Sequence, residues 1–171
     1  MVCWGSWANT FKVTKKWRYE LFYFDYAFGM LLAALVGAKD RGIRVLFQFD
    51  PAIDLVLADR VQIQQVLVNL FRNALEAMAV STHRELIASN TRAADDMVEI
   101  AVADTGPGFA DNALANLFQP FFTTKETGMG VGLSISRSII EAHSGRLWAE
   151  PNEGRGVRFA FTLPIPEGSS S

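Results

Sequence analysis

The stretch Thr123-Thr-Lys-Glu-Thr-Gly-Met-Gly-Val-Gly-Leu-Ser134 places glycines at positions 128, 130 and 132, immediately before a run with helical spacing. Glycine has no Cβ, so the backbone here can approach a ligand closely. The run has an apolar stripe formed by Val131, Ile135, Ile139 and Ala142. Gly145 predicts where this helix ends. A glycine loop that leads into a helix presents free backbone N–H groups and the positive end of the helix dipole, which favours a phosphate, although an ordinary turn into a helix has the same pattern.

The composition of the 171-residue chain is that of one globular domain with a hydrophobic core, because half of the residues are hydrophobic and a fifth are charged. The 16 basic and 18 acidic residues give a net charge of −2, so charge provides no argument for binding nucleic acid. The single cysteine, Cys3, excludes an intramolecular disulfide and a cysteine metal cluster. This composition is typical of the reducing cytoplasm, where we expect the catalytic part of the protein to be located.

Residues 1–37 differ in character from the sequence that follows. They contain three of the four tryptophans and, after Asp25, an apolar run shorter than the roughly 20 residues that a bilayer span requires. The sequence of Trp4–Thr10 and Lys15–Tyr23 resembles the start of a sugar- or drug-transporter-type membrane protein. We therefore expect residues 1–37 to be foreign to the domain, as a fusion remnant would be. The alternative is an aromatic-rich segment that packs on the domain or associates with a membrane surface.

From Asp40 onward, the pattern of apolar residues predicts strands and helices. Alternation predicts strands at residues 43–49, 85–91, 98–104, 146–150 and 157–163, with a hairpin turn at 152–156. Asp59 and Gln62 form a capping-box pair, which predicts the start of a helix that continues to about Ala79. Its core-facing side is predicted to be Ile63, Val66, Leu67, Leu70, Ala74 and Met78. Residues 166–171 are expected to form a disordered tail.

Two asparagines, Asn69 and Asn73, are four residues apart in this helix and therefore lie on one face. Asparagine is a mediocre helix former, so a pair of them in an otherwise apolar helix requires an explanation. One interpretation is a solvated polar face. The other is a pair of amide groups that face a ligand or a Mg²⁺ ion, which takes oxygen ligands together with phosphates.

Asp104 is in phase with the apolar side of the strand at 98–104 and is followed by the turn Thr105-Gly-Pro-Gly108. A buried carboxylate is costly unless it is hydrogen-bonded. Asp104 either caps this turn or accepts a hydrogen bond from a ligand at the floor of a pocket, and its in-phase position favours the second interpretation.

The aromatic cluster Leu117–Phe122 precedes the glycine loop. It is either part of the core or the hinge of a mobile lid. The segment 106–131 has little regular pattern, and loops of this length are usually functional.

Together, these motifs resemble the ATP-binding catalytic domain of bacterial sensor histidine kinases, a fold shared with gyrase, Hsp90 and MutL proteins. The resemblance covers residues 38–165. Its motifs occur in order as an N box at 65–78, a glycine box at 104–109, an F box at 118–125 and a second glycine box at 128–133. The sequences of residues 72–78 and 136–143 are most similar to those of kinases of the nitrogen-fixation and nitrogen-regulation type.

The resemblance implies an α+β fold: a two-layer α/β sandwich with helices on one face of a mixed, mostly antiparallel sheet, and a mobile lid over ATP. It also implies that Asn73 ligates Mg²⁺, that Asn69 acts beside it at the catalytic centre and that Asp104 accepts the adenine amino hydrogen. The other residues implied to bind ATP are Gly106, Gly108, Lys125, Gly128, Gly130, Gly132 and Leu133.

The sequence departs from this fold's ATPases and from complete histidine kinases. The ATPases carry a glutamate where this chain has Asn69, so the chain resembles a domain that holds ATP for transfer. His83 and His143 both lie within the catalytic domain, and neither is in a phosphoacceptor motif. We therefore expect no autophosphorylation, but transfer to a histidine domain in trans and then to a response regulator. The alternatives are a non-catalytic nucleotide-binding or regulatory module and a serine kinase of the anti-sigma-factor type.

Overall fold

The computed structural model describes residues 20–23, 42–53, 55–94, 96–109, 116–122 and 130–165. Several predicted features lie outside these ranges, namely Lys125, Gly128, the tail 166–171 and residues 1–19 and 24–37 of the N-terminal segment. Within the described ranges, no helix combines the length and the apolar character that crossing a bilayer requires.

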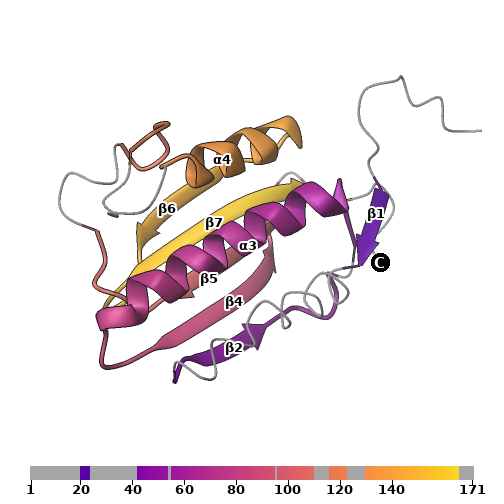
Figure 1. The fold of residues 1–171 in the computed structure, drawn as a ribbon. Helices are drawn as coiled ribbons and strands as arrows, with labels where there is room; N and C mark the ends of the chain where they lie inside the picture. The colour runs from indigo at the N-terminus through magenta and orange to yellow at the C-terminus, as the bar shows by residue number, and fades with distance from the viewer. Residues whose placement is uncertain are drawn as a thin grey trace, which may run out of the picture.

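A five-stranded sheet forms one layer of the fold, with strand order β2-β4-β5-β7-β6 (Figure 1). Its strands are β2 (Arg44–Gln48), β4 (Glu85–Arg92), β5 (Met97–Asp104), β6 (Leu147–Pro151) and β7 (Val157–Pro164). β2 is parallel to β4, and all other neighbours are antiparallel. The prediction of a mixed, mostly antiparallel sheet is therefore confirmed.

Alternating burial along the central strands explains why these segments form a sheet. In β5, Val98, Ile100 and Val102 are buried together with Asp104, and each is paired with or adjacent to a buried residue of β7. Successive side chains of a strand point to opposite faces, so these apolar residues form one continuous surface. That surface packs in a single core with the helices, which lie on one face of the sheet (Figure 1).

Helix α3 (Arg60–Ala77) crosses the sheet and is followed by the short 3₁₀ helix η1 (Met78–Val80). All six residues of its predicted core side are buried. The predicted N-cap is confirmed, because Oδ1 of Asp59 accepts hydrogen bonds from the N–H groups of Val61 and Gln62. The return bond expected from the Gln62 side chain is not formed. The Asp59 N–H instead donates to Nε2 of His143 at 3.0 Å.

Helix α4 (Gly132–Ala142) begins and ends where the sequence predicts, but its buried face differs from the predicted stripe. Ile135 is 44% exposed and Ala142 is also exposed, whereas Ser136 and Ile140 are buried. Spacings of three and four residues fit two neighbouring faces of a helix, so the choice depends on packing. Gly145 follows the helix because a Cβ there would lie 2.0 Å from the carbonyl oxygen of Thr162 on β7.

A separate two-stranded sheet joins β1 (Glu20–Tyr23) to β3 (Leu55–Ala58) in antiparallel register. The sequence analysis did not predict β3. β1 belongs to the segment 1–37, so these four residues of that segment pair with the domain. The proposed foreign origin of residues 1–37 stays a prediction.

Candidate functional site

Asp104 ends β5 and is only 2% exposed. Its Oδ1 atom accepts hydrogen bonds from the backbone N–H groups of Gly106, at 2.8 Å, and Val157, at 3.4 Å. Burial raises the pKa of the Asp104 carboxyl above its ordinary value, while these two hydrogen bonds act in the opposite direction. Oδ2 accepts no hydrogen bond from any described residue and is not fully buried, so it is available to a ligand.

Two glycines allow backbone to pack directly against Asp104. A Cβ on Gly106 would lie 2.8 Å from Oδ1 of Asp104 and 3.2 Å from the Cβ of Ala77 on α3. A Cβ on Gly156 would lie 1.9 Å from the Asp104 carbonyl oxygen, and Gly156 also has a φ of +99°. The same carbonyl oxygen accepts a 2.9 Å hydrogen bond from Nδ2 of Asn152. The carboxylate is thus held between the turn after β5 and the β6–β7 hairpin.

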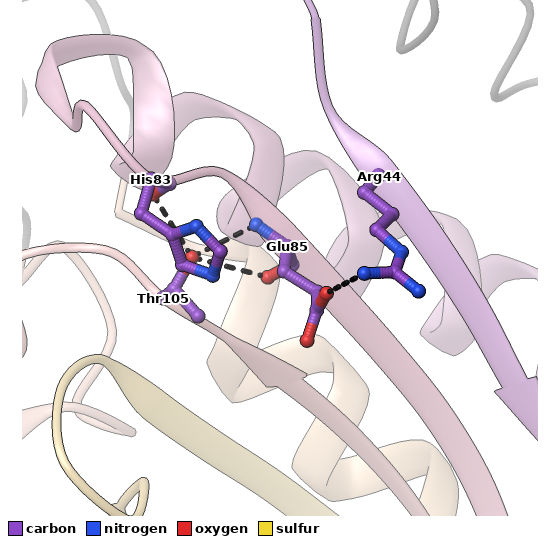
Figure 2. Close-up of polar contacts among 4 residues, drawn as sticks. All are labelled: Arg44, His83, Glu85 and Thr105. Carbon is purple, nitrogen blue, oxygen red and sulfur yellow. Dashed lines mark hydrogen bonds and ion pairs between the residues drawn. The ribbon is translucent and has the colours of Figure 1, made fainter.

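Thr105 ties this turn to the start of β4 (Figure 2). Its Oγ1 atom accepts a 2.8 Å hydrogen bond from the N–H of Glu85 and donates to the carbonyl oxygen of His83 at 3.0 Å. The Glu85 side chain in turn forms a 3.5 Å ion pair with Arg44 on β2. The backbone that carries Asp104 is therefore fixed to the neighbouring strand.

At the other end of the site, Asn69 on α3 lies against the N-terminus of α4. Its Nδ2 donates a 3.0 Å hydrogen bond to Oγ of Ser136. A Cβ on Gly132, the first residue of α4, would lie 2.5 Å from Oδ1 of Asn69. The same oxygen is 3.5 Å from Nη2 of Arg72. Glycine at position 132 is therefore required for this close approach of the two helices.

Asn69, Asn73 and Ala77 follow one another at four-residue intervals along the same face of α3. Ala77 lies against Gly106, at the Asp104 end, and Asn69 lies against Gly132. With a rise of about 1.5 Å per residue, Asn69 and Ala77 are roughly 12 Å apart along the helix, with half-buried Asn73 between them. This face of α3 therefore connects the carboxylate of Asp104 to the start of α4.

The N-terminus of α4 is suited to an anion. Its N-cap residue is Val131, which has no side-chain group that can bond the first N–H groups of the helix, and the first turn contains no acidic residue. These N–H groups and the helix dipole favour negative charge. The residue types beside them also fit a Mg²⁺ ion that shares phosphate oxygens, because Asn69, whose Oδ1 lies against Gly132, and Asn73, one turn further along α3, carry neutral amide oxygens. No group of three or more His, Cys, Asp or Glu residues that could hold a metal occurs in the described part of the chain.

The structure places the other predicted binding residues as follows. Gly130, with a φ of +66°, packs against the backbone of Phe121 and Phe122, and its carbonyl oxygen accepts a 3.0 Å hydrogen bond from the Phe121 N–H. Gly108 has a φ of +84° and lies near Gly156. Leu133 packs against the hydrophobic core. Lys125 and Gly128 are outside the described residues.

Three side chains that organise the site were not identified from the sequence. Asn152 forms a hydrogen bond with Asp104, and Ser136 forms one with Asn69. His143, at the end of α4, bonds to Asp59 at the start of α3. A polar residue in phase with the buried face of α4 is the signal that could have identified Ser136 and His143. This signal was not used because the predicted apolar stripe of α4 was the wrong face of the helix.

Comparison with known proteins identifies proteins that are similar to this chain in sequence and in fold. The family model described as "Histidine kinase-, DNA gyrase B-, and HSP90-like ATPase" matches residues 58–167. The sensor protein FixL of Bradyrhizobium diazoefficiens is 68% identical over 133 residues, which are 78% of this chain but only 26% of FixL, so the chain spans about a quarter of that relative.

Solved structures give the same result for the fold. The nucleotide-free catalytic domain of the histidine kinase ThkA matches with a TM-score of 0.74 and 30% identity, over 87% of this chain and 98% of that domain. ThkA in complex with the response regulator protein TrrA matches with a TM-score of 0.73 and 31% identity, over 86% of this chain and 42% of ThkA.

Proposed function

Because the chain belongs to the histidine kinase-, DNA gyrase B- and HSP90-like ATPase family, we propose that residues 38–165 are the ATP-binding catalytic domain of a two-component sensor histidine kinase. In this proposal the domain transfers the γ-phosphate of ATP to a histidine on another domain or chain. The 68% identity to FixL supports this proposal over a serine kinase of the anti-sigma-factor type and over a non-catalytic nucleotide-binding or regulatory module.

The observation that carries the proposal is the position and chemistry of Asn69. It lies against the N-terminus of α4, and its Nδ2 is committed to Ser136. A carboxylate at this position could take a proton from an attacking water, but a neutral amide cannot. An amide here supports a site that holds ATP until a separate phosphoacceptor arrives, and it disfavours a site that hydrolyses ATP.

Phosphoryl transfer depends mainly on positioning and on neutralising charge, and the residues of the site have these roles in the proposal. Oδ2 of Asp104 accepts the adenine amino hydrogen, while Gly106 and Gly108 let backbone pass close to the base. The N–H groups at the start of α4 bind the phosphates, with Lys125 and Gly128 contributing from the lid. Asn73, with Asn69, would hold Mg²⁺, which supplies positive charge against the phosphate oxygens.

In this proposal, neither histidine of the chain is the phosphoacceptor. His143 is 2% exposed, and its ring nitrogens bond the carbonyl oxygen of Ile139 and the N–H of Asp59. His83 is exposed, and its carbonyl oxygen accepts a hydrogen bond from Thr105, the residue after Asp104. We infer that the chain does not autophosphorylate and that the acceptor histidine is supplied in trans. A response regulator, as in the ThkA–TrrA complex, is the proposed downstream partner.

The test is a titration of the full chain with ATP, with and without Mg²⁺, followed by incubation with γ-labelled ATP and a separate histidine phosphoacceptor domain of a FixL-type kinase. We expect Mg²⁺-dependent binding that prefers adenine and transfer of an acid-labile phosphate to the acceptor. Asn73→Ala is the control that should lose both. A folded chain that binds no ATP would overturn the nucleotide site. Binding without transfer to histidine, or transfer to a serine acceptor, would support one of the alternative functions.

A further inference from the structure

Ser136 differs from the other two serines on α4 in what its hydroxyl contacts. Oγ of Ser134 donates to the carbonyl oxygen of Val131 at 2.9 Å, and Oγ of Ser138 donates to that of Ser134 at 3.1 Å. Both of these bonds lie within or next to the same helix. Ser136 is only 2% exposed, and its Oγ accepts a 3.0 Å hydrogen bond from Asn69 on α3. A buried hydroxyl that pairs across two helices fixes their relative position, because breaking the pair would leave a buried polar group unsatisfied.

The Asn69 amide has two possible orientations, and its contacts with Ser136 and Arg72 together fit one of them. An asparagine amide presents a donor nitrogen on one side and an acceptor oxygen on the other, and a half-turn exchanges them. With Nδ2 on Ser136, Oδ1 faces Gly132 and the Nη2 donor of Arg72. The reverse orientation would bring two donors together, because a guanidinium has no acceptor. Arg72 therefore selects the orientation, and the Ser136 hydroxyl, which can accept or donate, anchors the amide by accepting from the nitrogen that this orientation places beside it.

We propose that Ser136 is a positioning residue that holds the Asn69 amide with Oδ1 directed at the start of α4, where the phosphates and Mg²⁺ bind. This inference rests on the proposed function, because it takes Asn69 to act at the phosphate end of the site. Oδ1 is the atom that a hard cation or a Mg²⁺-bound water prefers, whereas Nδ2 can only donate. The bond also couples α4, which starts directly after the glycine loop, to the helix that carries both asparagines.

Removing the hydroxyl should weaken the Mg²⁺-dependent part of nucleotide binding and leave the metal-independent part unchanged. Loss of one neutral hydrogen bond that orients a ligand group corresponds to roughly a fivefold decrease in affinity. We therefore expect the ratio of ATP affinities with and without Mg²⁺ to fall about fivefold in Ser136→Ala. Ser138→Ala is the matched control, because Ser138 is exposed, lies on the same helix and makes only an intrahelical bond.

The experiment is calorimetric titration of the full chain with ATP, with and without Mg²⁺, for the wild type, Ser136→Ala, Ser138→Ala, Asn69→Ala and the Asn69→Ala/Ser136→Ala double variant. If Ser136 acts through Asn69, its substitution has no further effect once Asn69 is alanine. A role of Ser136 that does not pass through Asn69 would instead give additive losses. Urea unfolding checks that each variant is folded. Ser136→Cys, which keeps the volume with a weaker acceptor, replaces Ser136→Ala if the latter unfolds.

Three outcomes would overturn the proposal: an unchanged Mg²⁺-dependent ratio in Ser136→Ala, an equal loss in Ser138→Ala, or additive losses in the double variant. Failure of the proposed function is recognised separately, because the wild type itself would then bind no ATP. The Asn69–Ser136 bond remains measurable without nucleotide. The side-chain amide resonance of Asn69 should shift in the ligand-free Ser136→Ala variant and stay in place in Ser138→Ala.

Discussion

The backbone N–H of Asp59 donates a 3.0 Å hydrogen bond to Nε2 of His143, a residue 84 positions later in the chain. Nδ1 of the same ring lies 2.8 Å from the carbonyl oxygen of Ile139. The tautomer that satisfies both bonds is neutral, with the proton on Nδ1. One buried imidazole thus caps the last turn of α4 and pairs the N–H that precedes α3, which fixes the ends of the two helices that flank the site.

Replacing this imidazole should destabilise the fold. His143→Ala removes a fully buried side chain and leaves the Asp59 N–H without its partner, so we expect the free energy of unfolding to fall by about 2–4 kcal/mol. Urea denaturation measures the change. His83→Ala, at an exposed histidine, is the control and should stay within about 0.5 kcal/mol of the wild type. Equal stability of the two variants would contradict the role given to His143.

Gly156 and Gly154 form a matched pair for testing the backbone contact with Asp104. Both have positive φ values, +99° and +83°, but a Cβ on Gly154 would have no neighbour within 4 Å, whereas one on Gly156 would meet the Asp104 carbonyl oxygen. Alanine at either position costs roughly 1–2 kcal/mol for the left-handed backbone. Gly156→Ala should cost at least about 1 kcal/mol more and should also weaken nucleotide binding. Similar urea-unfolding and titration results for both variants would show that the contact is unimportant.

Asn73→Ala should abolish Mg²⁺-dependent nucleotide binding and leave the fold intact. Asn73 is half-buried on the face of α3 that joins Asn69 to Ala77, and it is not among the buried core residues. We expect the free energy of unfolding to change by less than about 1 kcal/mol. Titration with ATP and Mg²⁺ measures the loss, with exposed Gln65→Ala as the control on the same helix. Unchanged ATP affinity would exclude Asn73 as the Mg²⁺ ligand.

Asp104→Asn should weaken adenine nucleotides specifically. The substitution keeps an oxygen that can accept from Gly106 but removes the charge of the acceptor for the adenine amino group, which corresponds to about 1–3 kcal/mol of binding free energy. Titrations with ATP and GTP measure both affinity and base preference. Glu153→Gln, an exposed residue of the β6–β7 hairpin, is the control. If ATP and GTP bind to Asp104→Asn as they do to the wild type, this carboxylate does not recognise adenine.

The pH dependence of stability tests the burial of the same carboxylate. Desolvation raises the pKa of Asp104 in the folded protein above its ordinary value of 3.8. The folded state therefore holds the proton more tightly than the unfolded state does, so this group's stabilising contribution is complete below pH 3.8 and is lost as pH rises through the folded-state pKa. Asp104→Asn cannot titrate. Between about pH 3.5 and 7, urea unfolding should show the wild type losing stability relative to this variant, and an increase would have the wrong sign.

Much of the fold follows from local patterns in the sequence. The alternation in β5 and β7 and the apolar side of α3 place Val98, Phe161 and Leu67 correctly in the core. Asp59 identifies the start of α3, and Gly132 and Gly145 mark the ends of α4. The candidate site residues come from the same kind of signal, Asp104 from its phase in a strand and Asn69 and Asn73 from their spacing in a helix, and their roles stay predictions.

Other features could not be obtained in this way. The spacing of α4 fits two faces, and the one containing Ser136 and Ile140 is buried because it packs on α3 and the sheet. β3 was missed because a strand of four residues gives little alternation, and its partner β1 is distant in sequence.

Local sequence patterns were sufficient to locate helices α3 and α4, the strands of the five-stranded sheet and the residue types that suit a nucleotide. These properties depend on neighbours within about four positions, where side-chain period and turn chemistry act. Only the packed chain shows that Ser136 bonds to Asn69, that His143 pairs with Asp59 and that Gly156 packs on Asp104. Each of these contacts joins different elements. The two hydrogen bonds form because a buried polar group must find a partner, and Gly156 is needed because the backbone of Asp104 leaves no room for a Cβ. Only the packed chain determines which groups come this close.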